Sequence, residues 1–371
     1  MGDRSRDDAG AGPPPSSPHL PASPPSAPPS HEGPPDSGLG SRISALALPP
    51  IRQAPAEHRT SVERPADFDA FWEALLAEAA AIPLNPSMEL VPLRSTDEVA
   101  VYEIGYDSLG GLRIAGWYCV PRAERLPPPY PGLLIVPGYI SEPTLPKSWA
   151  RLGYAAVGVA PRGKLRSNDR FNPGYPGLLV RDIIDRHTYG YRGFYIDACR
   201  AVDFLHSRSE VDPERIGVHG SSQGGALTIT TAALRPDAIA CGAAGAPYLC
   251  GVMDAAALTH SYPYEEINEE LRRFPDREPA MRAAVAYYDG INFAPRIRCP
   301  MLVYVGLADD VCPPETGYDV VAAMRCPTEL HVYPRCAHDA GIAWEMPKIE
   351  AFLAAHLRPA AVAGHAEPTV G

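Results

Sequence analysis

The chain has 371 residues, 45% of them hydrophobic, and a formal net charge of −11. This size allows one large globular domain or two ordinary ones. An acidic chain lacks the clustered positive charge of a general nucleic-acid-binding protein, and no uninterrupted apolar run reaches the roughly 18 residues of a membrane span. We therefore expect neither nucleic acid nor a membrane among its partners.

The first 60 residues form a separate region, rich in Pro, Ser and Ala. Such a segment cannot bury enough apolar surface to offset the entropy that it loses on ordering, so we expect a disordered tail over 1–60. A polyproline II ligand for a partner domain is the alternative interpretation. No apolar stretch follows the charged N-terminus, which argues against a secretory signal.

The eight cysteines form no C-x-x-C pair, and no metal-ligand spacing is present. We therefore expect buried, reduced thiols in a cytoplasmic protein, with no metal.

Helical and strand patterns begin near residue 63. Phe68, Trp72 and Leu75 have helical spacing, and Pro83 ends that pattern. Next come two alternating segments, 99–108 and 112–121, whose short Gly-rich connection predicts a hairpin.

Short apolar runs then alternate with helical patterns, which predicts an α/β fold with a mostly parallel central sheet flanked by helices. Residues 249–297 interrupt the alternation, and we expect them to form a helical insertion over the sheet. The predicted domain is 61–358, followed by a flexible tail, 359–371. Further strands are predicted at 131–138, 154–161, 215–220, 238–247, 300–309 and 328–334, and helices at 191–207, 223–234, 315–325 and 342–357.

A G-x-S-x-G motif at 220–224 lies between an apolar strand and a helical pattern. This context is typical of a nucleophile elbow, in which Ser222 stands on a sharp turn and its Oγ is lifted out of the sheet. The amide of Gln223 lies at the helix N-terminus, where a free N–H and the helix dipole stabilise a developing oxyanion. The alternative is a Gly-rich turn without chemistry.

A serine nucleophile needs a base, and the base needs an orienting acid. His338 follows the last predicted strand, and it is the candidate base; His331 lies inside that strand and fits a structural role. The acid should follow the preceding strand, which ends at Asp309 and Asp310. The pattern alone leaves both open, because either could cap the next helix.

These residues resemble the acetyl xylan esterase and cephalosporin C deacetylase family of α/β-hydrolases. The resemblance runs from about 63 to 358 and is most distinctive over 186–227, RHTYGYRGFYIDACRAVDFL through HGSSQGGAL. GLADDVCPPET resembles the family's acid loop, in which the first acidic residue belongs to the triad, so the resemblance selects Asp309.

The resemblance also implies an oxyanion hole made by Tyr139, through its hydroxyl, and the amide of Gln223. It implies no cofactor, a small acyl ester as substrate, and a homo-oligomer, either a hexamer or a dimer. One departure is Arg162-Gly163-Lys164, where the family has R-G-Q. We treat Arg162 and Lys164 as candidate substrate-binding residues; the alternative for Lys164 is a solvated loop charge.

The predicted function is that of a serine esterase which removes acetyl or other short acyl groups from alcohols, including sugars and antibiotics. An acyltransferase, or a tailoring esterase or lactonase of specialised metabolism, is the main alternative because it would use the same nucleophile. A prolyl-oligopeptidase-type peptidase and a non-catalytic scaffold fit less well.

Overall fold

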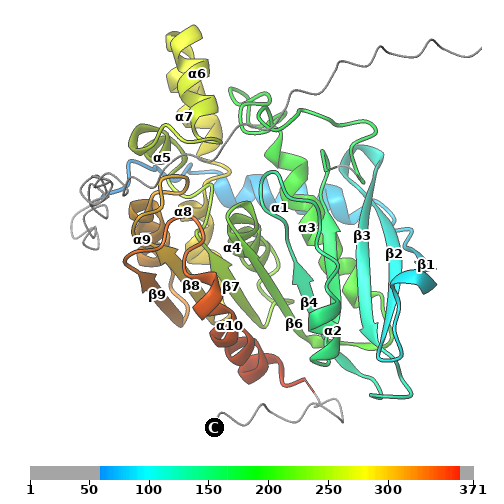
Figure 1. The fold of residues 1–371 in the computed structure, drawn as a ribbon. Helices are drawn as coiled ribbons and strands as arrows, with labels where there is room; N and C mark the ends of the chain where they lie inside the picture. Colours follow the sequence, from blue (N-terminus) through cyan, green and yellow to red (C-terminus); the bar gives the residue numbers. More distant parts are fainter. Residues whose placement is uncertain (1–58, 165, 360–371) are drawn as a thin grey trace, which may run out of the picture. The chain divides into compact units, whose positions relative to one another are not determined.

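A computed structural model describes residues 59–164 and 166–359 of the chain (Figure 1). The two predicted tails, 1–60 and 359–371, lie almost wholly outside these ranges. The described residues contain one nine-stranded sheet with the order β1-β2-β3-β5-β4-β6-β7-β8-β9. Its strands are β1 (Ser87–Leu90), β2 (Val99–Ser108), β3 (Leu112–Pro121), β4 (Tyr130–Ile135), β5 (Ala155–Ala160), β6 (Val211–Ser221), β7 (Cys241–Gly245), β8 (Met301–Gly306) and β9 (Thr328–Tyr333).

The sheet is mostly parallel, as predicted. The strands from β5 to β9 in the sheet order pair in parallel, whereas β1, β2 and β3 form an antiparallel extension on one side. Every residue of β4, β5, β7 and β8 is buried. Continuous apolar runs are typical of parallel strands covered on both faces. The hairpin between β2 and β3 is confirmed in its predicted bounds.

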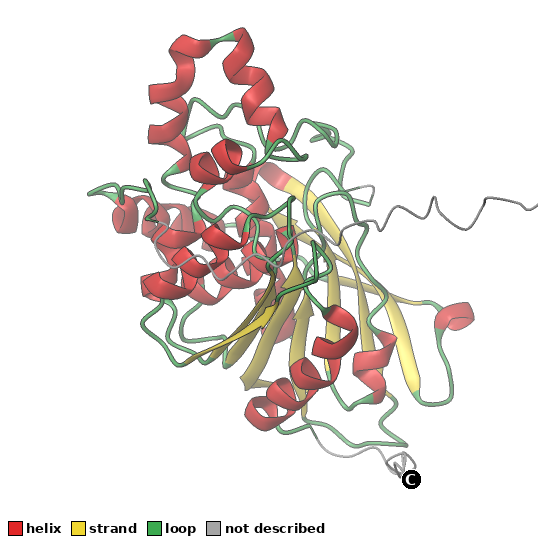
Figure 2. Ribbon diagram, turned by 60° about the vertical axis from the view of Figure 1, so that its left-hand side comes forward, coloured by secondary structure: helices red, strands yellow, loops and turns green. Residues whose placement is uncertain are grey.

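Helices cover both faces of the sheet (Figure 2). Alternating side chains of β4 enter separate core clusters, because successive residues of a strand point to opposite faces: Leu134 packs with one helix layer and Leu133 with the other. The first layer contains α3 (Tyr191–His206), α4 (Gln223–Leu234) and α9 (Pro314–Ala323), with α1 (Phe68–Ala80) outside α3; the second contains α2 (Lys147–Arg151) and α10 (Ile342–Leu357).

The predicted insertion is helical and lies beyond the carboxyl ends of the parallel strands (Figure 1). It consists of α5 (Val252–Leu258), α6 (Glu265–Arg273), α7 (Glu278–Val285) and α8 (Gly290–Phe293). Tyr264, at the start of α6, is fully buried against Tyr248 below it, with ring centroids 4.9 Å apart. The insertion is therefore packed onto the core around the sheet.

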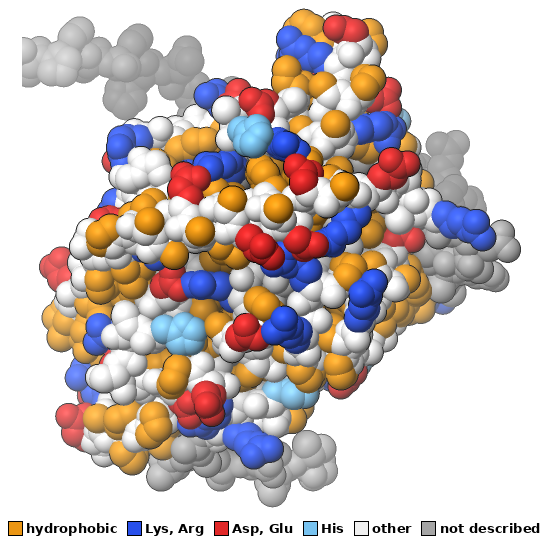
Figure 3. Space-filling model, turned by 180° about the vertical axis from the view of Figure 1, so that it is seen from behind, with side chains coloured by type: hydrophobic (Ala, Val, Ile, Leu, Met, Phe, Trp, Pro, Cys, Tyr) orange, Lys and Arg blue, Asp and Glu red, His pale blue; other side chains and the backbone are white. Residues whose placement is uncertain are grey.

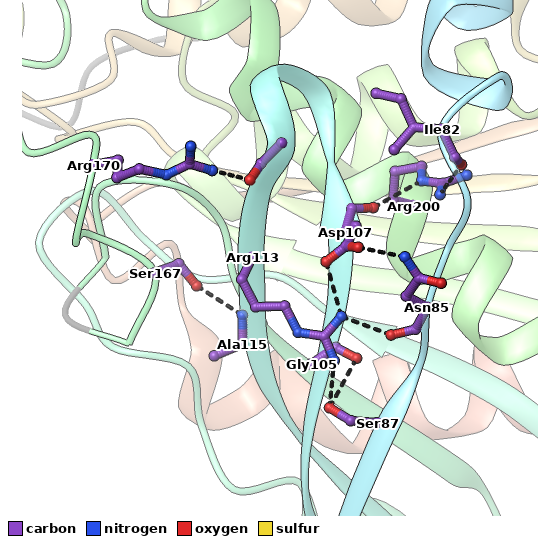
Figure 4. Close-up of polar contacts among 11 residues, drawn as sticks. Ile82, Asn85, Ser87, Gly105, Asp107, Arg113, Ala115, Ser167, Arg170 and Arg200 are labelled. Atoms are coloured by element: carbon purple, nitrogen blue, oxygen red, sulfur yellow. Dashed lines mark hydrogen bonds and ion pairs between the residues drawn. The ribbon is translucent and has the colours of Figure 1, made fainter.

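Two short elements, β1 and α2, were not predicted. β1 has four residues and is mostly exposed, so it carries no alternating apolar pattern. Arg113 of β3 holds this edge by donating to Ser87 Oγ at 2.5 Å, Asp107 Oδ1 at 2.9 Å and the Asn85 carbonyl at 2.6 Å (Figure 4). These side-chain contacts replace the apolar pattern that identifies an inner strand.

Acidic and basic side chains are interspersed on the face turned away from the view of Figure 1, as Figure 3 shows. Within 59–164 and 166–359, none of the helices has the length and apolar character required to cross a membrane.

Candidate active site

Ser222 occupies the sharp turn between β6 and α4. Its backbone has φ 60° and ψ −122°, a conformation that costs an L-residue free energy and persists only where the surroundings enforce it. A Cβ on Gly224 would lie 2.5 Å from the Val136 carbonyl oxygen, and one on Gly220 would lie 2.7 Å from the same atom. The two glycines therefore let the turn approach β4 closely, as the sequence motif predicts.

The structure brings Ser222, His338 and Asp309 into one hydrogen-bonded chain. His338 Nε2 lies 3.0 Å from Ser222 Oγ, and His338 Nδ1 lies 2.9 Å from Asp309 Oδ2. Asp309 is only 1% exposed, and its other oxygen, Oδ1, accepts the backbone N–H groups of Val311 and Cys312 at 2.8 and 2.9 Å. The carboxylate is thus held in place by the loop that follows β8.

This arrangement assigns the His338 tautomer. A carboxylate oxygen only accepts, so Nδ1 carries the proton and Nε2 presents its lone pair to the Ser222 hydroxyl. The neighbouring Asp310 is exposed and points elsewhere, with its Oδ2 accepting from Ser261 Oγ at 3.4 Å. Of the two carboxylates that the sequence pattern left open, Asp309 is the one that contacts the histidine.

Cys312 belongs to this loop, and its side chain is buried. Burial raises the pKa of its thiol well above the usual value, and the negative charge of Asp309 acts in the same direction. A neutral thiol is a poor nucleophile, so Cys312 serves as a packing residue beside the serine.

A cavity of about 540 Å³ opens over the serine. Its volume is within the range of small-molecule sites. Ser222 and His338 lie in its wall, and Tyr262 and Pro263 of the insertion also line it. A larger cavity of about 870 Å³ lies between residues 61–65 and α7, and no triad residue lines it. The smaller cavity is therefore the candidate substrate site.

The Tyr139 side chain does not fit the role that the resemblance implied. Its hydroxyl donates to Glu266 Oε1 at 2.5 Å and accepts from the Leu179 N–H at 3.1 Å. The hydroxyl proton is thus committed to a carboxylate of α6, which lies behind the loop. Within the described part of the chain, the Tyr139 backbone N–H has no hydrogen-bond acceptor, and it remains the group that could serve an oxyanion.

Gln223 is placed as predicted, at the first position of α4, where the backbone N–H has no acceptor within the helix. Its side chain also contacts the loop after β4: Nε2 donates to the Gly138 carbonyl at 3.3 Å, and Oε1 accepts from Tyr191 at 2.9 Å. Gln223 therefore connects the helix N-terminus to the loop that carries Tyr139.

The structure contradicts a direct substrate contact for Arg162 and Lys164. Arg162 is buried and forms a two-point ion pair with Asp197, with Nε and Nη2 each 2.8 Å from a carboxylate oxygen. Lys164 is 2% exposed, and its ammonium donates to the carbonyls of Gly138 and Tyr139. Neither Arg162 nor Lys164 is among the described residues that line the 540 Å³ cavity. Both are therefore positioned by protein groups, and Lys164 is not a solvated loop charge.

The comparisons with known proteins show the family of the chain. A family model described as acetyl xylan esterase (AXE1) matches residues 46–356. This chain belongs to the acetyl xylan esterase family. The α/β-hydrolase fold and the acetyl xylan esterase part of the resemblance are thereby confirmed, and a cephalosporin C deacetylase activity stays a prediction.

Individual relatives of this family align over most of the described residues. Acetyl esterase Axe7A of Xylanibacter ruminicola is 32% identical over 74% of this chain, which spans 64% of that protein's length. The structure of an acetyl xylan esterase from Paenibacillus sp. R4 superposes with a TM-score of 0.76 at 31% identity, covering 81% of this chain and 97% of that one. Acetyl xylan esterase 1 from Thermoanaerobacterium sp. JW/SL YS485 gives 0.73 at 25% identity, covering 79% and 96%.

Two residues near the site escaped the sequence analysis. Glu266 lies in an acidic stretch that is typical of a solvated helix face, yet it is 4% exposed and accepts from Tyr139 and from the Gly177 N–H. Burial raises its pKa, and these hydrogen bonds act in the opposite direction. Tyr191, which donates to Gln223 Oε1, is one of several aromatic residues near the start of α3 in the sequence. Neither position carries a local signal, because each role depends on a partner distant in sequence.

Proposed function

We propose that this member of the acetyl xylan esterase family is a serine esterase that removes acetyl or another short acyl group from alcohol esters. The observation that carries the proposal is the hydrogen-bonded order Ser222–His338–Asp309, whose serine and histidine lie in the wall of a small-molecule cavity. The names of the related proteins, acetyl esterase and acetyl xylan esterase, support the acetyl group as the acyl part.

In the first half of the reaction, His338 Nε2 takes the proton of the Ser222 hydroxyl as Oγ attacks the ester carbonyl carbon. The tetrahedral intermediate then collapses, the bond to the alcohol oxygen breaks, and His338 returns its proton to that oxygen. The products of this half are the free alcohol and an acyl group on Ser222. Asp309 keeps His338 in the required tautomer and stabilises the imidazolium.

In the second half, His338 removes a proton from water, and the resulting hydroxide attacks the acyl carbonyl. Collapse of this second intermediate releases the carboxylic acid, and His338 returns the proton to Ser222 Oγ. In both halves the carbonyl oxygen becomes negatively charged and needs donors. We assign these to the backbone N–H groups of Gln223 and Tyr139, each worth about 2.7–4 kcal/mol of barrier.

The size of the cavity supports small esters as substrates. Its lining is more apolar than polar and includes Tyr262 and Val311. An acetyl group is far smaller than the cavity of about 540 Å³. The remaining space would hold the alcohol part of the ester, such as one sugar unit.

The test is hydrolysis of 4-nitrophenyl acetate, butyrate and octanoate by the wild-type protein and by Ser222→Ala. We expect the acetate to be turned over fastest and kcat of the variant to fall by about 10⁴-fold or more. Ser148→Ala, an exposed serine of α2, is the matched control and should retain full activity.

Two results would count against this function. Fastest turnover of the octanoate would exclude a short-acyl enzyme, and undiminished activity of Ser222→Ala would exclude the serine as nucleophile. Product analysis in the presence of a sugar alcohol separates hydrolysis from acyl transfer: acetate is the product of an esterase, and a new acetyl ester is the product of a transferase.

A further inference from the structure

The ammonium group of Lys164 lies against the loop that carries Tyr139. Its Nζ donates to the Gly138 carbonyl oxygen at 2.8 Å and to the Tyr139 carbonyl oxygen, and it lies 4.3 Å from the ring centroid of Tyr175. With 2% exposure, it has given up most of its contact with water. Burying a cation costs free energy that neutral side chains avoid, so this placement needs a compensating role.

The backbone around Lys164 holds it in this position. Its N–H donates to the Pro161 carbonyl at 3.1 Å, and its carbonyl accepts from the Ser167 N–H at 2.7 Å. Ser167 Oγ in turn accepts the Ala115 N–H of β3 at 2.8 Å (Figure 4). The turn that presents the ammonium is therefore attached to the sheet, and the ammonium does not swing freely.

The Gly138 carbonyl belongs to the same peptide unit as the Tyr139 N–H. In a trans peptide the C=O and N–H bonds point in opposite directions. The carbonyl is held by Lys164 Nζ and by Gln223 Nε2. Gly138 and Tyr139 also line the cavity together with Ser222. Fixing the carbonyl away from the cavity directs the N–H toward it.

We propose that Lys164 is a positioning residue for ester hydrolysis, which orients and polarises the Gly138–Tyr139 peptide so that the Tyr139 N–H donates to the oxyanion. This inference rests on the proposed function. A cation on the carbonyl side of a peptide draws electron density from the nitrogen, so the N–H becomes a stronger donor. The positive charge is also close to the place where negative charge develops.

The charge of Lys164 depends on pH in the working range. Burial lowers the pKa of Lys164 to about 7, and the negative charge of Glu142 acts in the opposite direction. Lys164 also contacts two tyrosines, through the Tyr139 carbonyl and the Tyr175 ring; burial raises the pKa of both phenols, so both stay neutral. As the pH rises through about 7, Lys164 loses its charge and kcat should fall.

The experiment compares Lys164→Met, which removes donor and charge, with Lys164→Gln, which keeps a neutral donor. We expect Lys164→Met to lower kcat for 4-nitrophenyl acetate by about 10-fold or more, with KM within about twofold. Lys164→Gln should retain more activity, and its pH profile should lack the alkaline decline of the wild type. Lys147→Met, a half-buried lysine at the start of α2, is the matched control and should behave as the wild type.

The proposal is overturned if folded Lys164→Met keeps kcat within twofold, or if KM rises while kcat is unchanged, since that indicates a substrate contact. If Lys164→Met does not fold, the pH profile of Lys164→Gln decides: an unchanged alkaline decline overturns the proposal.

A wild-type protein that hydrolyses no short ester would contradict the proposed function. In that case the rate at which a fluorophosphonate labels Ser222 tests the role of Lys164 separately. The labelling reaction is suitable because it also builds negative charge on an oxygen atom. Slower labelling of Lys164→Gln supports the positioning role, and equal rates overturn it. If the wild type reacts with neither the esters nor the probe, both proposals fail.

Discussion

The Tyr139 hydroxyl donates to Glu266 Oε1 at 2.5 Å, although the two residues are 127 positions apart. The contact joins the loop after β4, which borders the nucleophile, to helix α6 of the insertion. Gly177 donates its N–H to the other oxygen of the same carboxylate at 2.9 Å. One buried carboxylate therefore ties three segments together around the candidate site.

Replacing Tyr139 with Phe tests this role of the hydroxyl. We expect the free energy of unfolding to fall by about 1–3 kcal/mol, because Glu266 keeps its burial and loses a donor. Urea unfolding measures this change. The value of kcat should fall by less than about 10-fold, since the backbone N–H is retained. A loss of 100-fold or more in a folded variant would restore the hydroxyl to the oxyanion hole.

Substitutions of the two neighbouring carboxylates in the loop after β8 should have very different effects on kcat. Asp309→Asn should lower kcat by about 10⁴-fold, because an amide in that place favours the wrong His338 tautomer. Asp310→Asn should leave kcat within about threefold, since its carboxylate contacts Ser261. Steady-state kinetics of the two variants checks the assignment, and the reverse order of losses would transfer the acid role to Asp310.

Gly224 tests the steric requirement of the elbow. In Gly224→Ala the new methyl group would meet the Val136 carbonyl oxygen at 2.5 Å, and neither backbone can easily move. We expect unfolding to become easier by about 1–3 kcal/mol and kcat to fall, because Ser222 is displaced. Gly105→Ala is the control: its methyl group would meet the Arg113 Nε at 2.9 Å and Ser87 Oγ at 3.1 Å, which are side-chain atoms at the β1 edge and not backbone, so kcat should be unchanged. Equal effects of the two substitutions would contradict the steric account.

Arg162 should matter for stability and not for substrate affinity. Arg162→Met leaves the fully buried carboxylate of Asp197 without its cation. We expect the free energy of unfolding to fall by about 3–5 kcal/mol, with partial recovery in Arg162→Met/Asp197→Leu. Thermal and urea unfolding measure both variants. If a folded Arg162 variant instead shows a raised KM with unchanged stability, the substrate-binding hypothesis holds after all.

The nucleophile, the base and the class of fold could be predicted from the sequence alone. Ser222 directly follows β6, and His338 lies in the loop after β9; both strands are visible in the sequence, and the carboxyl ends of parallel strands meet at one edge of a sheet. Local pattern is sufficient there, because the backbone turn after each strand largely decides where the side chain stands. The same reasoning reached Asp309 and Asp310 and could not separate them.

Only the tertiary structure decided what Tyr139, Arg162 and Lys164 contact. The sequence places each of them after a strand near the site, and from there a long side chain can turn toward the substrate or back into the protein. The direction of each side chain depends on which hydrogen-bond acceptor lies within its reach in the folded protein: Glu266 for the tyrosine, Asp197 for the arginine and the Gly138 carbonyl for the lysine. These partners come from other segments of the chain, so a polar side chain that loses water on folding finds its compensating hydrogen bond only once those segments have packed together.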